Sequence, residues 1–423
     1  MKSKQIQAVR GMNDVLPDEA PLWEFFEDSV RGWLRAYGYR NIRLPILERT
    51  ELFRRSIGEV TDIVEKEMFT FVDQSNESLT LRPEGTASCA RALVEHGVLA
   101  SGGPQRLYYI GPMFRHERPQ KGRFRQFHQV GVEAFGFSGP DIDAEQIVMC
   151  SRLWQILGLD GITLQLNTLG NPEARELYRN ELVAYFQVHR DKLDSDSKRR
   201  LTQNPLRILD SKNPEMQSVI NSAPTFSEFL DSDSINHFEK LKKYLSQNKV
   251  AFEVNPRLVR GLDYYNKTVF EWVTKQLGAQ GAICAGGRYD GLVDQLGGPR
   301  TPACGFAIGT ERTIELIKMA TRGTEPVPID FYIVRAGGLA DEYSLQVAEQ
   351  LRTGGNTGIL HVGGGSLASQ LRKASASSAT YAVIIGDDEA GAGMVSVKPL
   401  REAGEQRRVA VAEAIDLIKK RDS

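Results

Sequence analysis

The sequence has few cysteines, and the four present lie far apart. Cys89, Cys150, Cys284 and Cys304 include no C-x-x-C pair. This spacing indicates neither a disulfide framework nor a zinc site, and it is typical of reduced thiols in a cytosolic protein. We therefore expect a cytoplasmic protein that holds no zinc.

Long apolar runs and an excess of charge of one sign are also missing. No run approaches the roughly 20 apolar residues that a membrane span needs. The N-terminal stretch MKSKQIQAVRGMNDVLP has neither the apolar core nor the cleavage site of a secretory signal. The net charge of −1 argues against a protein that coats nucleic acid, so any such contact must come from a local patch. We expect no membrane association.

The 423 residues exceed one typical core, and the apolar pattern divides them into parts. Helical and strand-like segments mix over the first 320 residues, with a polar, helix-rich insertion at 171–250. Two prolines at 321–328 indicate a linker. Strands then alternate with helices, which predicts a small α/β domain with a mostly parallel sheet. The predicted domains are 1–325, including the insertion, and 327–423.

In the first part, a strand is expected at 43–47, where Pro45 suits a sheet edge or a contact with another subunit. Two apolar runs at 107–110 and 130–135 predict a β-hairpin. The remaining segments follow from helical or strand-like spacing. Helices are expected at 18–36, 51–56, 83–96, 144–157, 175–192 and 227–246, and strands at 68–72, 78–82, 162–166 and 252–254. A buried strand that turns into a helix is expected at 301–318.

The hairpin at 111–135 carries the densest chemistry, with the sequence GPMFRHERPQKGRFRQFHQVGVEAF. Its tip is rich in cations and its stems carry aromatic residues. A guanidinium can fork onto a phosphate, and an aromatic face can stack on a base. Composition alone fits a solvated charged loop equally well.

Three further motifs have a functional and a plain structural interpretation. Arg115 and Glu117 would share one side of a strand, where they could meet a phosphate and an adenine amine, although a surface ion pair is commoner. The strand-to-helix stretch GFAIGTER has small residues that let a flat ligand approach, with Arg312 above it, but it also fits a core strand. LVRGLDYY offers phenols and an acid to an imidazole or ammonium, or it is an aromatic turn.

Taken together, these motifs identify a resemblance to a known family. FRHERPQKGRFRQFHQ resembles the second motif of the class II aminoacyl-tRNA synthetases, GFAIGTER the third, and the stretch around Pro45 the first. LVRGLDYY and AGGRYDGL resemble two stretches of the histidine enzymes, and RGMNDVLP and LRPEGTA add to the match. The sequence is similar to bacterial histidyl-tRNA synthetases over essentially its whole length.

The resemblance implies an α+β fold with a six-stranded antiparallel sheet flanked by helices, an inserted helical domain and a C-terminal α/β anticodon-binding domain. It also implies a homodimer that uses ATP with Mg²⁺ to convert L-histidine to histidyl-adenylate and pyrophosphate. Histidine is then transferred to the 3′ end of tRNA(His). No organic cofactor and no metal site made by protein ligands alone are implied.

The resemblance also assigns roles to residues. Arg260, in the place of a metal ion, and Arg115 at the α-phosphate are the implied catalytic residues. The other roles fall into three groups. For ATP they are Glu117 and Phe127 at adenine, and Arg123 and Arg312 at the β- and γ-phosphates. For histidine they are Glu84, Gly85 and Thr86 at the α-amino group, Gln129 near the carboxylate, Glu133, Tyr264 and Tyr265 around the imidazole, and Tyr289 behind them. For the tRNA acceptor end they are Arg118, Gln120 and Lys121.

Two alternatives remain from the sequence. One is the non-catalytic, histidine-binding regulatory subunit of ATP phosphoribosyltransferase, which typically lacks the anticodon domain. The other is a class II synthetase for proline, threonine or glycine. The segment from 327 onward and the intact Arg115, Arg260 and Arg312 argue against the first, and LVRGLDYY against the second. Where relatives often place lysines after a Gly-x-Ser-Leu start, this sequence has GSLASQLRK at 365–373, so no anticodon contacts are assigned.

Overall fold

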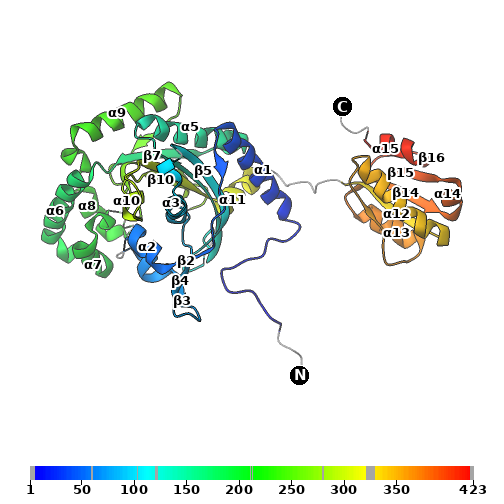
Figure 1. Ribbon diagram of the computed structural model, residues 1–423, viewed down its shortest axis with the longest axis horizontal. Coiled ribbons are helices and arrows are strands. Elements are labelled where there is room, and N and C mark those ends of the chain that lie inside the picture. Colours follow the sequence, from blue (N-terminus) through cyan, green and yellow to red (C-terminus); the bar gives the residue numbers. More distant parts are fainter. Residues whose placement is uncertain are drawn as a thin grey trace. The chain divides into compact units, whose positions relative to one another are not determined.

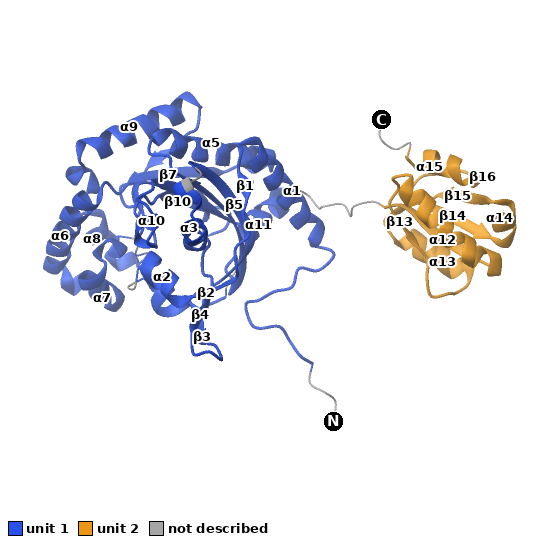
Figure 2. Ribbon diagram, in the orientation of Figure 1, with its two compact units in different colours: residues 1–322 blue, residues 323–423 orange. Residues whose placement is uncertain are grey.

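The computed structural model describes residues 5–58, 61–101, 103–119, 122–209, 211, 213–278, 281–320 and 329–419. The chain forms two compact units, 1–322 and 323–423 (Figures 1 and 2). The expected linker at 321–328 lies outside the described residues. No helix in the described ranges has the length and apolar character needed to cross a bilayer.

An eight-stranded sheet organises the first unit. Its six central strands pair antiparallel, while the two short edge strands are parallel to their neighbours. The implied six-stranded antiparallel sheet is thus confirmed, with two edge strands added. In sheet order the strands are β1 (Arg40–Asn41), β5 (Gln105–Phe114), β6 (Gln126–Phe135), β11 (Ala303–Gly309), β10 (Ala282–Arg288), β9 (Asn266–Thr274), β7 (Ile162–Thr168) and β8 (Glu253–Val254).

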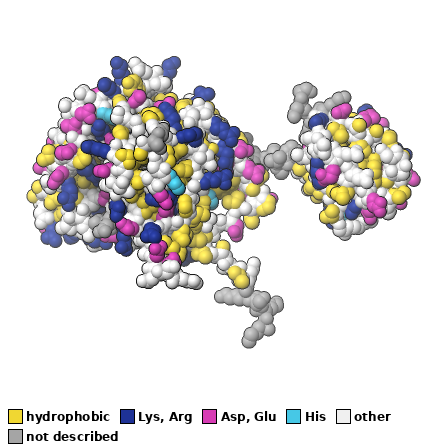
Figure 3. Space-filling view, viewed as in Figure 1, with side chains coloured by type: hydrophobic (Ala, Val, Ile, Leu, Met, Phe, Trp, Pro, Cys, Tyr) yellow, Lys and Arg dark blue, Asp and Glu magenta, His cyan; other side chains and the backbone are white. Residues whose placement is uncertain are grey.

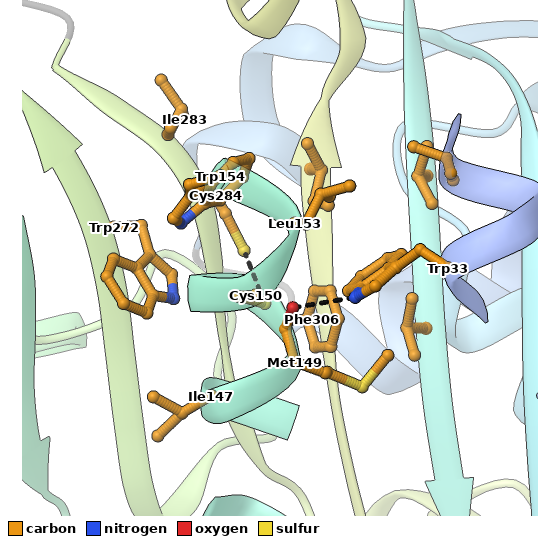
Figure 4. Packing of buried hydrophobic residues seen from close by; sticks show 14 of the residues in the cluster. Trp33, Ile147, Met149, Cys150, Leu153, Trp154, Trp272, Ile283, Cys284 and Phe306 are labelled. Atoms are coloured by element: carbon orange, nitrogen blue, oxygen red, sulfur yellow. Dashed lines mark hydrogen bonds between the residues drawn. The ribbon is translucent and has the colours of Figure 1, made fainter. Parts of the chain in front are cut away.

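One face of this sheet is covered by amphipathic helices. Helices α1 (Ala20–Ala36), α5 (Pro140–Ile156), α9 (Ser232–Gln247) and α11 (Thr310–Ala320) bury their apolar sides against it. Figure 4 shows this core, where the Trp33 indole N–H donates to the carbonyl of Met149 at 2.8 Å. Side chains alternate along a strand, and the opposite face carries a second apolar cluster that includes Leu107, Phe135 and Val269.

The expected strand at 43–47 is wrong. The structure has β1 before it and β2 (Leu47–Arg49) after it, with 42–46 outside any strand. The buried Arg82 side chain donates hydrogen bonds to the carbonyl oxygens of Leu44 and Pro45 at 3.1 and 3.3 Å. Pro45 also has no N–H group to donate to a neighbouring strand. β2 instead joins a three-stranded sheet with β4 (Ser78–Leu81) and β3 (Phe69–Val72).

Short helices complete the first unit. Within the described part of the insertion the secondary structure is helical throughout, as expected. The remaining helices outside the insertion are α2 (Thr50–Ile57), the π turn η1 (Ile63–Glu67), α3 (Thr86–Glu95), α4 (Val98–Ser101) and α10 (Leu292–Gln295). The insertion contains α6 (Pro172–Val188), η2 (Arg190–Lys192), α7 (Ser195–Gln203), η3 (Pro205–Ile208), η4 (Pro214–Met216), α8 (Gln217–Asn221), η5 (Phe226–Phe229) and α9.

The second unit is a five-stranded sheet with helices. The prediction of a mostly parallel sheet is only half right, because β13, β12 and β14 pair in parallel while β15 and β16 pair antiparallel. The connection between β14 and β15 holds only a six-residue helix, too short for a parallel crossover. In order along the chain the elements are β12 (Ile329–Ala336), α12 (Gly338–Thr353), β13 (Gly358–Leu360), α13 (Leu367–Ala376), β14 (Ala379–Gly386), α14 (Asp387–Ala392), β15 (Met394–Pro399), β16 (Arg407–Ala410) and α15 (Val411–Lys419).

A buried ionic network joins α5, α9, β9 and β10. Asp143 accepts from Arg288 at 2.5 Å and from the Thr268 hydroxyl at 2.7 Å, and its carboxylate lies 2.8 Å from His237. The side chains of Asp143 and Arg288 are 1% and 0% exposed. Burial alone would raise the pKa of Asp143, but the Arg288 charge and the His237 hydrogen bond lower it below its usual value. The network fixes the end of β10, just before Tyr289.

We expect Asp143→Asn to lower the free energy of unfolding of the first unit by about 3–5 kcal/mol, because it leaves Arg288 buried without its counter-charge. Urea denaturation followed by tryptophan fluorescence measures this, since all four tryptophans lie in the first unit. Glu239→Gln, which breaks an exposed pair with Lys242, is the control and should cost less than about 0.5 kcal/mol. An equal, small effect of both changes would contradict the prediction.

Candidate active site

The hairpin tip departs from the strand ladder at its base. β5 ends at Phe114, and both the Arg125 and Gln126 N–H groups donate to the carbonyl of Gly11, from the irregular N-terminal segment. Arg115 and Glu117 are therefore not on a strand, and the alternation argument for them was wrong. Both nevertheless line one cleft of about 560 Å³.

The cleft is lined by five arginines and three glutamates, a net charge of +2 (five minus three). Figure 3 shows both basic and acidic side chains on the face of the first unit that it draws. Phe127 and Gln129 also border the cleft, and the buried Oε1 atom of Gln129 has no hydrogen-bond partner among the described residues. The charged lining residues are Arg115, Arg123, Arg207, Arg260, Arg312, Glu117, Glu271 and Glu311.

Each predicted arginine is oriented by a neighbour. Arg115 donates from Nε to the carbonyl of Pro83 at 2.9 Å, and its guanidinium lies 5.3 Å from the centre of the Phe127 ring. Arg123 pairs with Glu117 at 2.9 Å. Arg312 donates to the carbonyl of Gly122 at 3.1 Å, and burial, together with the charge of Arg123, lowers its pKa. Like charges held this close in a cleft favour an anionic ligand.

Next to the cleft lies a buried carboxylate surrounded by hydroxyl groups. Glu133, on β6, accepts hydrogen bonds from Thr86 at 2.8 Å, from Tyr109 at 2.9 Å and from Tyr289. Burial raises the pKa of Glu133 to about 8, although these hydrogen bonds act in the opposite direction. A neutral carboxyl can donate a proton and a charged one can accept an N–H, so this group suits an imidazole.

Three tyrosine rings form the wall beside Glu133. The ring centres of Tyr264, Tyr265 and Tyr289 lie 4.7 to 6.2 Å apart. Glu84 lies at the start of α3, where its carboxylate accepts the N–H groups of Thr86 at 2.7 Å and Ala87 at 2.9 Å. Burial raises the pKa of Glu84, and these backbone bonds lower it in part.

Arg260 connects the two regions. It lines the cleft, its guanidinium lies 5.8 Å from the centre of the Tyr265 ring, and it pairs with Glu271 on β9. Its buried Nε has no hydrogen-bond partner among the described residues. Burial acts to lower the pKa of Arg260, but Glu271 and the tyrosines raise it, so it stays charged.

Glycines of the predicted motifs serve the protein's own side chains. A Cβ on Gly85 or Gly131 would lie 2.2 or 2.0 Å from the Tyr109 ring, and one on Gly305 would lie 1.9 Å from Glu133. The small residue at 305 thus makes room for Glu133 and not for a flat ligand. Ala307 and Gly309 of the same motif do line the cleft.

Sequence reasoning missed several residues of the site. Tyr109 was taken only as part of an apolar strand, although Gly131 lies directly opposite it in the register. Glu271 lies on β9, where the alternation of side chains could have placed it, but it belongs to none of the motifs discussed above. Glu311, inside GFAIGTER, accepts the His128 backbone N–H at 2.8 Å and lies 2.9 Å from its ring nitrogen, which fixes α11 to β6. No pattern or motif in the sequence pointed to Arg207, which comes from the helical insertion.

The tip faces a second hollow of about 360 Å³, bordered by Arg10, His116, Arg118 and Arg125 among others. Arg118 is exposed. Gln120 and Lys121, predicted to meet tRNA, lie outside the described residues. Across the described ranges, no group of three or more His, Cys, Asp or Glu side chains could hold a metal ion.

Comparisons with known proteins agree over the whole chain. A family model described as histidyl-tRNA synthetase matches residues 11–313, and one described as an anticodon binding domain matches 313–421. A histidine–tRNA ligase of Nitrosomonas europaea is 61% identical, covering 98% of both chains, and one of Thiobacillus denitrificans is 62% identical, covering 99% of this chain and 100% of the relative.

A solved structure gives the same result. The apo histidyl-tRNA synthetase of S. aureus is 32% identical and superimposes with a TM-score of 0.83, covering 98% of this chain and 100% of the other. Coverage of the second unit favours a ligase over the regulatory subunit that the sequence left as an alternative. The chain therefore belongs to the histidyl-tRNA synthetase family of class II aminoacyl-tRNA synthetases, enzymes that join histidine to tRNA.

Proposed function

We propose that this chain forms histidyl-adenylate from L-histidine and ATP in the cleft described above, and then transfers histidine to the 3′ end of tRNA(His). The observation that carries the proposal is the position of Arg260 between an arginine-lined cleft and a buried pocket of hydroxyls around Glu133. The carboxylate of a histidine held by its imidazole in that pocket would reach the α-phosphorus beside Arg260.

In the ATP half of the site, Arg115 and Arg260 bind the α-phosphate, and Arg123 and Arg312 bind the β- and γ-phosphates. The adenine stacks on Phe127 with Glu117 near its amino group. Support comes from the guanidinium groups of Arg115 and Arg312, which line one cleft and are each held by a backbone carbonyl. Catalysis then rests on positioning and preorganised positive charge, since the carboxylate attack needs little proton transfer.

In the histidine half, Glu133, Tyr264 and Tyr265 surround the imidazole, and Tyr289 lies behind them. Glu84 and Thr86, with Gly85 between them, receive the α-amino group, and Gln129 lies by the carboxylate. The unpartnered Gln129 Oε1 supports a ligand contact there. An apolar amino acid would leave these buried polar groups unpaired, a penalty of roughly 10⁴-fold in favourable cases.

We further propose that ATP enters as its Mg²⁺ complex, as substrate, without zinc or an organic cofactor. The three glutamates of the cleft already pair with a cation or accept an N–H group. We therefore propose that Mg²⁺ is bound mainly by the phosphates of ATP and not by a set of protein carboxylates. Arg118, Gln120 and Lys121 at the tip meet the tRNA acceptor end, and the exposed Arg118 is consistent with that role.

The remaining proposals concern assembly. The working form is a cytoplasmic homodimer, and exposed apolar side chains on the small sheet (Leu47, Phe71 and Val72) support a subunit contact there. The catalytic part spans 1–325 with the helical insertion at 171–250, and 327–423 binds the anticodon.

We expect the purified protein to exchange pyrophosphate into ATP only when histidine is present. Proline, threonine and glycine, the substrates of the other class II enzymes considered, serve as controls and should give no exchange. Charging of tRNA(His) extends the same assay to the second step. Histidine binding without any exchange would instead indicate a regulatory, non-catalytic protein.

A further inference from the structure

Arg175 lies near the start of α6, the helix that opens the helical insertion. Its Nη1 nitrogen donates to two backbone carbonyls of the core, that of Asp263 at 2.9 Å and that of Tyr265 at 3.1 Å. Between these two residues in the chain stands Tyr264, which belongs to the tyrosine wall beside Glu133. One guanidinium nitrogen of the insertion thus brackets a residue of the histidine pocket. Neither the sequence motifs nor the proposed function assigns a role to Arg175.

The segment that Arg175 holds has no regular structure. Residues 255–265, all of which the structure describes, belong to no helix or strand, so no ladder of strand hydrogen bonds fixes them. Buried carbonyl groups nevertheless need donors. At one end of the segment, Asn167 of β7 donates to the carbonyl of Leu258 at 2.9 Å, and Arg175 serves the other end. The position of the segment therefore depends strongly on side chains of neighbouring elements.

Asp263 ties the insertion and the core together. Its carboxylate accepts from Asn204, between α7 and η3, at 2.7 Å and lies 3.7 Å from Arg175. Its N–H donates to the carbonyl of Ile57, at the end of α2, at 3.0 Å. Helices α6 and α7 of the insertion, seen together in Figure 1, thus reach the core one residue before Tyr264.

Arg260, earlier in the same segment, is held by other partners. It pairs with Glu271 of β9, and Leu258, two residues before it, is held by Asn167. Loss of the Arg175 contacts should therefore disturb the tyrosine side of the segment more than its arginine side. Effects on histidine and on ATP are then separable.

We propose that Arg175 is a positioning residue for histidine, through which the helical insertion sets the place of Tyr264 and Tyr265. This inference rests on the proposed function, in which these two tyrosines surround the imidazole. Arg175 is not among the described residues that line the cleft, so it acts through the backbone that it holds. Fixing both carbonyls keeps the two rings beside Tyr289, at ring-centre distances of 5.5 and 6.2 Å. A pocket formed in advance loses less free energy to ordering when histidine binds.

Calorimetric titration and pyrophosphate exchange with the full-length protein test the proposal. Arg175→Met keeps an apolar stem and removes the donors. It should raise the dissociation constant and the KM for histidine ~10-fold, the scale of one charged hydrogen bond. The KM for ATP and kcat at saturating histidine should stay within about threefold of the wild type. Arg175→Lys, which keeps the charge and a donor, should recover part of the loss.

Arg257→Met is the matched control, because Arg257 joins the same segment to the same insertion. It donates to the carbonyls of Asn221, Ala223 and Pro224 and brackets no residue of the tyrosine wall. The variant should keep its histidine affinity within about threefold of the wild type. Equal losses in Arg175→Met and Arg257→Met would overturn the proposal, because loose docking of the insertion would then explain both. Unchanged histidine affinity in Arg175→Met would overturn it as well.

A double variant shows whether Arg175 acts through the tyrosine wall. Tyr264→Phe removes one of the hydroxyl groups proposed to surround the imidazole. If Arg175 places that hydroxyl, the loss of histidine affinity in R175M/Y264F should be smaller than the product of the two single losses. Single losses that multiply would show that Arg175 acts elsewhere, and the proposal would be wrong.

Arg175→Gln, which keeps an N–H donor, replaces the methionine variant if the latter fails to fold. It should still lose more histidine affinity than Arg257→Met, and an equal loss would count against the proposal in the same way. A wild-type protein that shows neither histidine binding nor histidine-dependent exchange would contradict the proposed function itself. Failure of the inference alone is distinguishable, because the wild type is then active.

Discussion

Replacing Arg260 by alanine should lower the rate of histidine-dependent pyrophosphate exchange by about a hundredfold or more, while histidine still binds. Arg260 lines the cleft between the arginines and the tyrosine wall, with a buried Nε that has no partner within the described ranges. In the proposed reaction, its charge stabilises the negative charge that develops on the attacked phosphate. A group that acts on the transition state changes kcat more than it changes substrate binding.

The measurements are exchange kinetics and a calorimetric histidine titration on the same preparation. Because Arg260→Ala also leaves Glu271 without its partner, the double variant R260A/E271Q separates that effect from the loss of the cation. Arg257→Ala is the matched control in the same loop, since Arg257 donates to the carbonyls of Pro224 and Asn221 and not into the cleft. Parallel losses of exchange and histidine affinity would show that Arg260 holds histidine instead.

Replacing Glu133 by glutamine should weaken histidine binding by about a hundredfold, the scale of a lost charged hydrogen bond. The carboxyl is fully buried and accepts from Thr86, Tyr109 and Tyr289. Glutamine keeps the shape and an acceptor oxygen, so the hydroxyl groups retain a partner and folding should be preserved. Thermal unfolding checks that the variant is folded. A destabilised variant whose folded molecules bind histidine with unaltered affinity would contradict the assignment.

The pH dependence of histidine binding follows from the same carboxyl. Burial raises its pKa to about 8, so the free protein holds it protonated at neutral pH. A raised carboxyl pKa makes the free energy of unfolding fall as pH rises from about 4.3, the unfolded value, toward 8. The imidazole side chain has a pKa of about 6.5, so the bound pair shares one proton between these two values.

Histidine affinity should therefore be nearly constant from about pH 6.5 to about pH 8. Below this window a proton must be released on binding, and above it a proton must be taken up, so affinity falls on both sides. Glu133→Gln should remove the alkaline fall and keep the acidic one. Calorimetry in buffers with different ionisation enthalpies counts the protons, and uptake of a whole proton at pH 7 would rule out this shared-proton scheme.

The local patterns predicted most of the fold for clear reasons. The period of apolar residues predicted the helices now seen as α1, α5 and α9 within a few residues, because each buries one apolar face on the sheet. Where a connection or a buried side chain intervened, the pattern failed. The Arg82 side chain donates to the carbonyls of Leu44 and Pro45, where a strand was expected. The short connection after β14 makes β15 antiparallel in a sheet that was expected to be mostly parallel.

The sequence alone determined which chemistry is present, since arginines, phenols and carboxylates cluster in motifs that can be read directly. Only the tertiary structure decided which of them meet. Tyr109 joins Glu133 because Gly85 and Gly131 leave space for its ring, and Arg207 reaches Gly261 because the insertion folds back onto the core. The physical reason is that a sequence period reports the direction of a side chain within one element. A contact between segments fifty residues apart depends on how those elements pack.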